Sequence, residues 1–243
     1  MRAKPTSAPS RSHRLARDDY TAAMEPPSLV APAATAYAAD RTSQFDGSLA
    51  AAVGWTSENT PVPGLMSGLA EARLLEALIV IGGASRVLEI GTFTGVGTLT
   101  MAAAMSPGGR ITTLEVDEDI AAAARTHFDQ TPYRGRIELI VGDARRTISE
   151  LEGPFDLVYI DAWKSDYPAY YDAVLPKLAE RGVIVADNLF REGAALDDDA
   201  RDEGTVGIRE FAHRVQQDQS VHNVLLTIGD GVMIVWPKPT GTH

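Results

Sequence analysis

Residues 86–97 read RVLEIGTFTGVG, and this stretch decides the fold. A short apolar run ends at Gly91, and apolar residues then recur with a helical period from 94 to 105. The run is almost continuously apolar, which is typical of a parallel strand covered on both faces. A strand, a glycine-rich turn and a helix in this order predict one unit of an α/β sheet, in which ligands bind at the carboxyl ends of the strands.

The same alternation continues toward the C-terminus. Further strands are expected at 110–116, 137–141, 155–160 and 182–186, and helices at 118–128, 144–151, 168–178 and 206–215. The last two apolar runs, 224–228 and 231–236, are separated by Gly229-Asp230, a tight-turn signal. The sequence therefore predicts a doubly wound, mostly parallel α/β sheet that ends in an antiparallel hairpin.

The chain begins with segments of a different character. Residues 1–20 are rich in Arg, Ser and Pro, and we expect a disordered basic leader there. They lack the apolar run of a signal peptide, whereas their Arg/Ser bias leaves an organelle presequence open. Residues 21–63 are expected to form a helical extension, with a helix at 46–53 broken at Gly54. A helical period at 67–81 then opens the main domain, which we place at 64–243.

Composition excludes several classes of function. The 243 residues carry a formal net charge of -11, which disfavours nucleic acid as the main partner. No cysteine is present, so disulfides, thiolate metal sites and cysteine nucleophiles are excluded, and oxygen ligands would point to a hard cation. The apolar runs are too short to cross a bilayer. We therefore expect a cytoplasmic protein without a membrane partner.

The loop after the first strand favours an amino-acid ligand over a diphosphate. Phe93 stands where a nicotinamide-binding G-x-G-x-x-G loop has its middle glycine. The carboxylate of Glu89 would repel a diphosphate and attract the ammonium group of a zwitterionic amino acid. A plain strand-to-helix turn is the simpler alternative.

Acidic residues also follow the second and third strands. Glu115 stands where an acid commonly accepts hydrogen bonds from ribose hydroxyls, in nicotinamide and adenosylmethionine proteins alike. Helix N-capping is the alternative for an acid at this point, and Asp117 can fill that role. Asp143, after the third strand, could accept a hydrogen bond from an adenine amino group or could cap the following helix.

The fourth and fifth strands end in oxygen-bearing side chains. Asp161 follows the fourth strand, and Asp187 and Asn188 follow the fifth. Neighbouring parallel strands would bring these three to one rim of the sheet, where two carboxylates and an amide carbonyl form a site for a hard cation. Each of the three taken alone could be a helix cap or a turn residue.

The chain from about 67 to 236 resembles the cation-dependent O-methyltransferases of the caffeoyl-CoA and catechol type. The matching blocks, in the family's order and approximate spacing, are VLEIGTFTG, TLEVD, VGDA, IDAWKSDY, VIVADN and IGDG. The resemblance implies the Rossmann-like fold of class I methyltransferases, with S-adenosylmethionine and a divalent cation, usually magnesium, as cofactors. It also implies methylation of one hydroxyl of a catechol-like aromatic small molecule with vicinal hydroxyls, and a homodimer.

The resemblance assigns roles to individual residues. The cofactor's methionine portion would be surrounded by Ser67, Glu89, Gly91, Thr92 and Gly95, its ribose bound by Glu115 and its adenine by Asp143 and Ala144, with Asp161 and Trp163 beside it. The cation would be held by Asp161, Asp187 and Asn188. Lys164 would lie next to the reacting hydroxyl as general base, with Asp161 in the same catalytic group. The residues Asn188, Phe190 and Arg191 would face substrate.

Two departures from the family pattern bear on these roles. Gly97 stands where many members have a serine, so a hydroxyl near the cofactor carboxylate is missing, and Thr98 or water would replace it. Trp163 stands where many bacterial members have an acid, which favours a small catechol over a coenzyme A ester.

Three alternatives stay open. Lys164 could form an ion pair with Asp161 and have no catalytic role. Arg191 could favour a ring that carries a carboxylate, or could be an exposed arginine that balances an acidic loop. A nicotinamide-dependent oxidoreductase on a similar sheet is the main alternative function.

Overall fold

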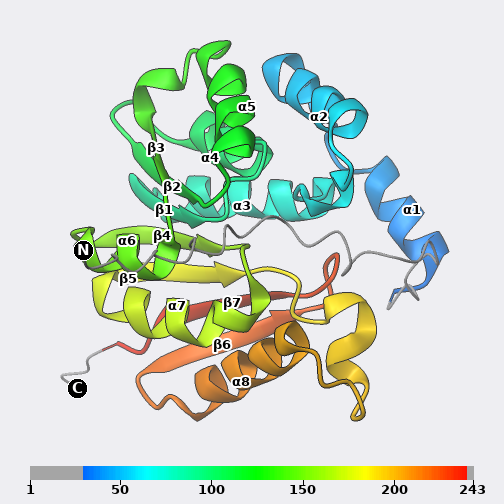
Figure 1. Cartoon of the computed structure of the whole chain (residues 1–243), viewed down its shortest axis with the longest axis vertical. Helices are drawn as coiled ribbons and strands as arrows, with labels where there is room; N and C mark the ends of the chain where they lie inside the picture. The colour runs from blue at the N-terminus through cyan, green and yellow to red at the C-terminus, as the bar shows by residue number, and fades with distance from the viewer. Residues whose placement is uncertain (1–29, 240–243) are drawn as a thin grey trace, which may run out of the picture.

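A central sheet of seven strands organises the chain, whose computed structural model describes residues 30–239. The strands lie in the order β3-β2-β1-β4-β5-β7-β6 (Figure 1). Their bounds are β1 Arg86–Ile90, β2 Arg110–Glu115, β3 Ile137–Val141, β4 Phe155–Ile160, β5 Leu178–Ala186, β6 Val221–Leu226 and β7 Val232–Pro237. The first five are parallel, and β7 runs antiparallel to both β5 and β6, so the predicted fold class is confirmed.

Helices cover both faces of this sheet (Figure 1). The helices are α1 Pro32–Asp40, α2 Gly47–Asn59, α3 Leu69–Gly82, α4 Val96–Ala104, α5 Glu118–Asp129, α6 Ala144–Glu150, α7 Tyr167–Val174 and α8 Glu203–Gln217. Side chains of α2, α3, α4 and α5 belong to one buried cluster, and those of α6, α7 and α8 belong to the other. Within the described residues, no helix has the length and apolar character needed to span a membrane.

The strand alternation assigns each side chain at the sheet's end to one face. On β4, Leu157 and Tyr159 pack in the cluster with α3 and α4, whereas Val158 and Ile160 pack in the cluster with α7 and α8. This follows from the two-residue period of a strand. Tyr159 therefore faces the α3 side, one residue before the end of its strand and two residues before Asp161.

The structure corrects three details of the expected elements. Helix α2 does not break at Gly54 but runs on to Asn59. A glycine costs a helix only about 1 kcal/mol relative to alanine, and the buried Thr56 contacts Thr94 Oγ1 at 2.8 Å beyond it. Strand β5 begins at Leu178 rather than 182. The sequence did not indicate this earlier start, because the first four residues of the strand are exposed or half-buried and show no apolar run. The hairpin turn spans residues 227–231, which is longer than the expected turn at Gly229-Asp230.

The N-terminal segments expected from the sequence fall partly within the described residues. The expected leader at 1–20 lies outside the described residues. The expected helical extension contains α1 and α2 in its described part. Helix α1 has no buried residue, whereas α2 buries Ala52 and Thr56 against the sheet domain.

Candidate active site

The carboxyl ends of β1, β4 and β5 are joined by backbone hydrogen bonds that extend the strand pairing. Asp161 N donates to Ile90 O at 2.9 Å, and Asp187 N donates to Ile160 O at 3.0 Å. Gly91 lies directly against this rim with φ 100°, and a Cβ there would come 2.0 Å from the carbonyl oxygen of Asp161. Only glycine accepts both constraints without strain, so Gly91 sets how closely the β1 and β4 loops approach.

Lys164 joins the loops that follow β4 and β5. Its Nζ lies 2.8 Å from Asp161 Oδ1, 2.6 Å from Asn188 Oδ1 and 2.9 Å from Tyr167 Oη. The lysine and Asp161 side chains are each only 16% exposed. Asn188 has φ 59°, a left-handed conformation that asparagine tolerates better than most residues. The predicted base and two predicted cation ligands therefore meet at one point.

Asp187 is the buried member of the cluster that it forms with Asp161, Lys164 and Asn188. The residue is 3% exposed, and burial, followed by the charge of Asp161, raises the pKa of its carboxyl. Its Oδ1 accepts a hydrogen bond from the backbone N–H of Asn188 at 2.7 Å, and its Oδ2 accepts one from Tyr159 Oη at 2.9 Å. The Tyr159 hydroxyl also lies 3.4 Å from Asp161 Oδ2. One phenol thus reaches both predicted carboxylate ligands.

The chemistry of this cluster fits a hard cation. Two carboxylates and an amide oxygen converge, and hydrogen-bond donors hold them in place, as the outer partners of metal ligands commonly do. The part of the chain that the structure describes contains no group of three His, Asp or Glu side chains that could hold a metal ion. The third oxygen here belongs to an amide, so the cluster depends on Asn188 as much as on the two acids.

Glu89 is buried under the glycine loop. The side chain is 1% exposed, and its Oε2 accepts hydrogen bonds from the hydroxyls of Thr98 and Thr113. Burial raises the pKa of this carboxyl to about 8, although the two threonine hydrogen bonds act in the opposite direction. Its Oε1 faces Gly97, where a Cβ would lie 2.8 Å away. Gly97 therefore makes room for the carboxylate, and Thr98 is committed to Glu89.

The remaining residues assigned to the cofactor line the same rim. Thr92 Oγ1 lies 2.5 Å from Thr113 Oγ1, and the buried Ser67, just before α3, has its Oγ 3.2 Å from Tyr159 Oη. Gly95, with φ 89°, lies against the ring of Phe128, where a Cβ would come within 2.4 Å. Trp163 is 45% exposed beside Lys164.

The two acids assigned to the adenosine half differ in their surroundings. Glu115 accepts hydrogen bonds from the backbone N–H groups of Phe93, Val116 and Asp117 at 2.8–3.0 Å, and burial raises the pKa of its carboxyl. The N-cap of α5 is Asp117, which leaves Glu115 free of that role.

Asp143, by contrast, caps α6 at the residue before Ala144. It accepts from the backbone N–H of Arg145 at 3.0 Å and pairs with that guanidinium at 2.7 Å, which lowers the pKa of the carboxyl. The capping role weighed for Asp143 is thus present in the structure.

In the loop after β5, two of the residues expected to face substrate, Phe190 and Arg191, point in different directions. Phe190 N donates to Asp230 O at 2.8 Å, and the Phe190 ring lies against Gly231, where a Cβ would come within 2.6 Å. Arg191 turns toward the start of α8, where its Nη2 lies 3.0 Å from Asp202 Oδ1. The arginine therefore balances an acid of the following acidic segment, the second of the two roles weighed for it.

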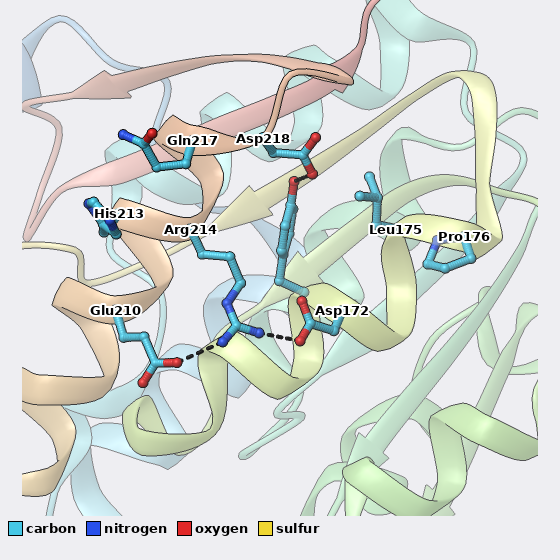
Figure 2. A pocket seen from close by; sticks show the side chains of 9 residues that line it. Asp172, Leu175, Pro176, Glu210, His213, Arg214, Gln217 and Asp218 are labelled. Atoms are coloured by element: carbon cyan, nitrogen blue, oxygen red, sulfur yellow. Dashed lines mark hydrogen bonds and ion pairs between the residues drawn. The ribbon is translucent and has the colours of Figure 1, made fainter.

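A groove of about 610 Å³ lies away from this rim, between α7 and α8 (Figure 2). Arg214 dominates it and pairs with both Asp172 and Glu210. Asp218, at the end of α8, accepts a hydrogen bond from Tyr171 Oη at 2.8 Å. These polar groups are paired with one another, so the groove offers no chemistry comparable to that of the strand ends.

Sequence reasoning missed four polar side chains of the site, namely Thr98 as a partner of Glu89, Thr113, Tyr159 and Tyr167. Tyr159 could have been found from the sequence, because it stands two residues before Asp161 and residues two apart in an extended strand share a face. The contact of Thr113 with Glu89 depends on strand register, and that of Thr98 depends on how α4 packs after β1, so neither could be read from the pattern.

Known proteins share this arrangement of sequence and fold. A sequence model of the O-methyltransferase family matches residues 41–238. The chain is 30% identical over 194 residues to a catechol O-methyltransferase of Niastella koreensis, covering 78% of this chain and 87% of that protein. It is 29% identical over 205 residues to the probable caffeoyl-CoA O-methyltransferase 1 of Dictyostelium discoideum, covering 82% and 89%.

A solved structure agrees with these relatives. The SAH-bound methyltransferase of Podospora anserina matches with a TM-score of 0.79 at 26% identity, over 85% of this chain and 94% of that one. The family match sets aside a nicotinamide-dependent oxidoreductase. The chain belongs to the O-methyltransferase family and is an S-adenosylmethionine-dependent methyltransferase of the caffeoyl-CoA and catechol type.

Proposed function

We propose that this methyltransferase is cation-dependent and methylates one hydroxyl of a catechol-like aromatic molecule. The observation that carries the proposal is the meeting of Asp161, Asp187 and Asn188 around Lys164 and Tyr159. Their oxygens suit a hard divalent cation such as Mg²⁺. When bound, such a cation would lower the pKa of the acceptor hydroxyl, as divalent ions do for coordinated water.

Lys164 would take the proton of the acceptor hydroxyl. A general base must lie within hydrogen-bond reach of the proton that it removes. Lys164 Nζ contacts both Asp161 and Asn188, so an acceptor oxygen beside these ligands lies next to the lysine, which accepts the proton as the neutral amine. Asp161 orients the lysine through the 2.8 Å contact.

The cofactor would lie along the glycine loop. Glu89 would receive the ammonium group of S-adenosylmethionine, because Gly97 places no side chain against its Oε1, which a Cβ would approach to 2.8 Å. Glu115 would receive the ribose hydroxyls. The sulfonium end would then point along the rim toward Asp161, since Gly91 holds the β1 loop against that residue.

A small aromatic acceptor with vicinal hydroxyls suits this rim. Two adjacent hydroxyls would be fixed by the same group of oxygens, which lowers the entropic cost of aligning the reacting one. Trp163, 45% exposed beside Lys164, offers a flat apolar surface for an aromatic ring. Relatives named for catechol and for caffeoyl-CoA both match this chain, and we propose the smaller class because of Trp163.

A screen with labelled S-adenosylmethionine tests the proposal. Catechol, 3,4-dihydroxybenzoate and caffeoyl-CoA are offered with Mg²⁺, with a chelator, and with Mg²⁺ restored. We expect transfer to at least one vicinal diol, loss with the chelator and recovery with the metal. Transfer that persists in full without divalent ions rejects the cation, and absence of transfer to all three vicinal diols rejects the catechol class.

A further inference from the structure

Tyr159 is a buried tyrosine whose hydroxyl lies at the centre of the site. The side chain is 2% exposed, and its ring packs on the α3 and α4 side of the sheet. Its Oη lies 2.9 Å from Asp187 Oδ2, 3.4 Å from Asp161 Oδ2 and 3.2 Å from Ser67 Oγ. These three partners come from the ends of two strands and from the segment before α3.

The geometry gives the hydroxyl a defined task. A phenol has one proton to donate and can accept in return. The shorter contact gives that proton to Asp187 Oδ2, and Ser67 can donate to the phenol oxygen. Asp187 Oδ1 already receives the backbone N–H of Asn188 at 2.7 Å. Both oxygens of Asp187 are therefore held by donors, which fixes the plane of the carboxylate.

Removal of the hydroxyl would release that plane. A phenylalanine fits the same space but leaves Asp187 Oδ2 buried without its donor, which is unfavourable for a buried polar atom. The Asp187 and Asp161 carboxylates, which repel each other when both are ionised, would also lose the polar hydroxyl that lies within 3.4 Å of both. Partners that orient metal-binding side chains typically change metal affinity by about 10–100-fold when they are removed.

We propose that Tyr159 is a positioning residue that orients Asp187, which together with Asp161 would hold the divalent cation, and that it connects Asp187 to Ser67 at the cofactor side. The inference rests on the proposed function, because it requires that these carboxylates hold a cation. It assigns to the tyrosine an action through its neighbours, with no contact to substrate.

The chain offers a matched control for the loss of a buried hydroxyl. Tyr171 is also 2% exposed, and its Oη donates to Asp218 Oδ2 at 2.8 Å, in the groove between α7 and α8 that is shown in Figure 2. Tyr171→Phe removes the same kind of tyrosine–carboxylate hydrogen bond at a distance from the site. A purely structural role for Tyr159 predicts that the two variants behave alike.

The test measures Mn²⁺ affinity directly, by electron paramagnetic resonance of the free ion, with the full chain as wild type, Tyr159→Phe and Tyr171→Phe. Each is measured with and without S-adenosylhomocysteine, whose binding favours the folded state. We expect the dissociation constant for Mn²⁺ to rise about tenfold or more in Tyr159→Phe and to stay within about twofold of wild type in Tyr171→Phe. Turnover of Tyr159→Phe should recover toward wild type at saturating cation.

Each other outcome has a defined meaning. Equal Mn²⁺ affinity in wild type and Tyr159→Phe overturns the positioning role, as does an equal loss in both variants. A wild type that binds no Mn²⁺ rejects the proposed cation dependence itself. If Tyr159→Phe does not fold, Tyr159→Met, which also lacks the hydroxyl, replaces it under the same comparison.

Discussion

Lys164 Nζ and Asn188 Oδ1 lie 2.6 Å apart, although the two residues follow different strands and are 24 positions apart in the chain. The contact holds the β4 and β5 loops together at the rim where the cation is proposed. It also places the amine nitrogen of Lys164 beside the oxygen of a proposed ligand. Lys164 either takes a proton from the acceptor there or only neutralises Asp161, and these two roles give different results on mutation.

Lys164→Ala separates the two roles. Since general-base catalysis contributes about 10²–10⁴-fold, we expect kcat to fall by at least about 100-fold. The dissociation constant for S-adenosylhomocysteine, measured by calorimetry, should stay within a few fold of wild type, because Lys164 contacts none of the glycine loop. Near-normal turnover would leave Lys164 with the ion-pair role alone.

Cofactor affinity should depend on pH through Glu89. Burial raises the pKa of Glu89 to about 8, so the unliganded carboxyl is protonated at pH 6. Pairing with the cofactor's ammonium group requires the carboxylate, so affinity for S-adenosylhomocysteine should rise as pH increases from 6 to 8, by up to about tenfold per unit. Calorimetry across this range should show that slope in wild type and lose it in Glu89→Gln.

The same group gives a stability prediction with the opposite sign. An acid whose folded pKa is raised binds its proton in the folded state after the unfolded state has lost it. The unfolding free energy of the unliganded protein should therefore fall as pH rises from about 4.5 to 8, and Glu89→Gln should flatten this decline. A wild type whose stability rises over that window would contradict a protonated Glu89.

Gly91→Ala should weaken the fold at the rim. The new Cβ would lie 2.0 Å from the carbonyl oxygen of Asp161, in a backbone conformation with φ 100°. We expect the free energy of unfolding to drop by at least about 2 kcal/mol in urea denaturation. Gly54→Ala is the control, since it adds a Cβ to a helix with no atom within 4 Å and should be neutral or stabilise by up to about 1 kcal/mol. Equal effects of the two substitutions would remove the argument from close approach.

Arg191→Ala should affect all acceptors alike. The guanidinium pairs with Asp202 at 3.0 Å and points toward α8, so it should not recognise a carboxylate on the ring. We expect the ratio of kcat/KM for 3,4-dihydroxybenzoate to that for catechol to change less than about threefold, a free-energy difference below about 0.7 kcal/mol. A selective loss with dihydroxybenzoate would restore the carboxylate-binding role for Arg191.

The sequence predicted the sheet more fully than the side-chain contacts. The bounds of β1, β3 and β4 agree residue for residue with the expected runs. For β1 and β4 the reason is that buried parallel strands leave a nearly continuous apolar pattern. The pattern did not predict the strand order, and the start of β5 at Leu178 was hidden by exposed residues. Asp161, Asp187 and Asn188 were grouped correctly at one rim because neighbouring parallel strands end together.

The contacts that the sequence could not supply all join distant positions. Tyr159 and Asp187 are 28 residues apart, and their hydrogen bond depends on the register between β4 and β5. Glu89 and Thr113 meet through the pairing of β1 with β2, in which they are register partners. Arg191 contacts Asp202 from a loop in which both Arg191 and Glu192 adopt positive φ. Arginine and glutamate rarely adopt this conformation, so the sequence could not predict it.

The central claim, a cation held by Asp161, Asp187 and Asn188, is tested most directly by anomalous X-ray diffraction from crystals grown with Mn²⁺ and S-adenosylhomocysteine. We predict a single strong anomalous peak enclosed by the oxygens of these three side chains. The claim would be contradicted if crystals grown with Mn²⁺ contained bound S-adenosylhomocysteine but showed no anomalous peak among these oxygens.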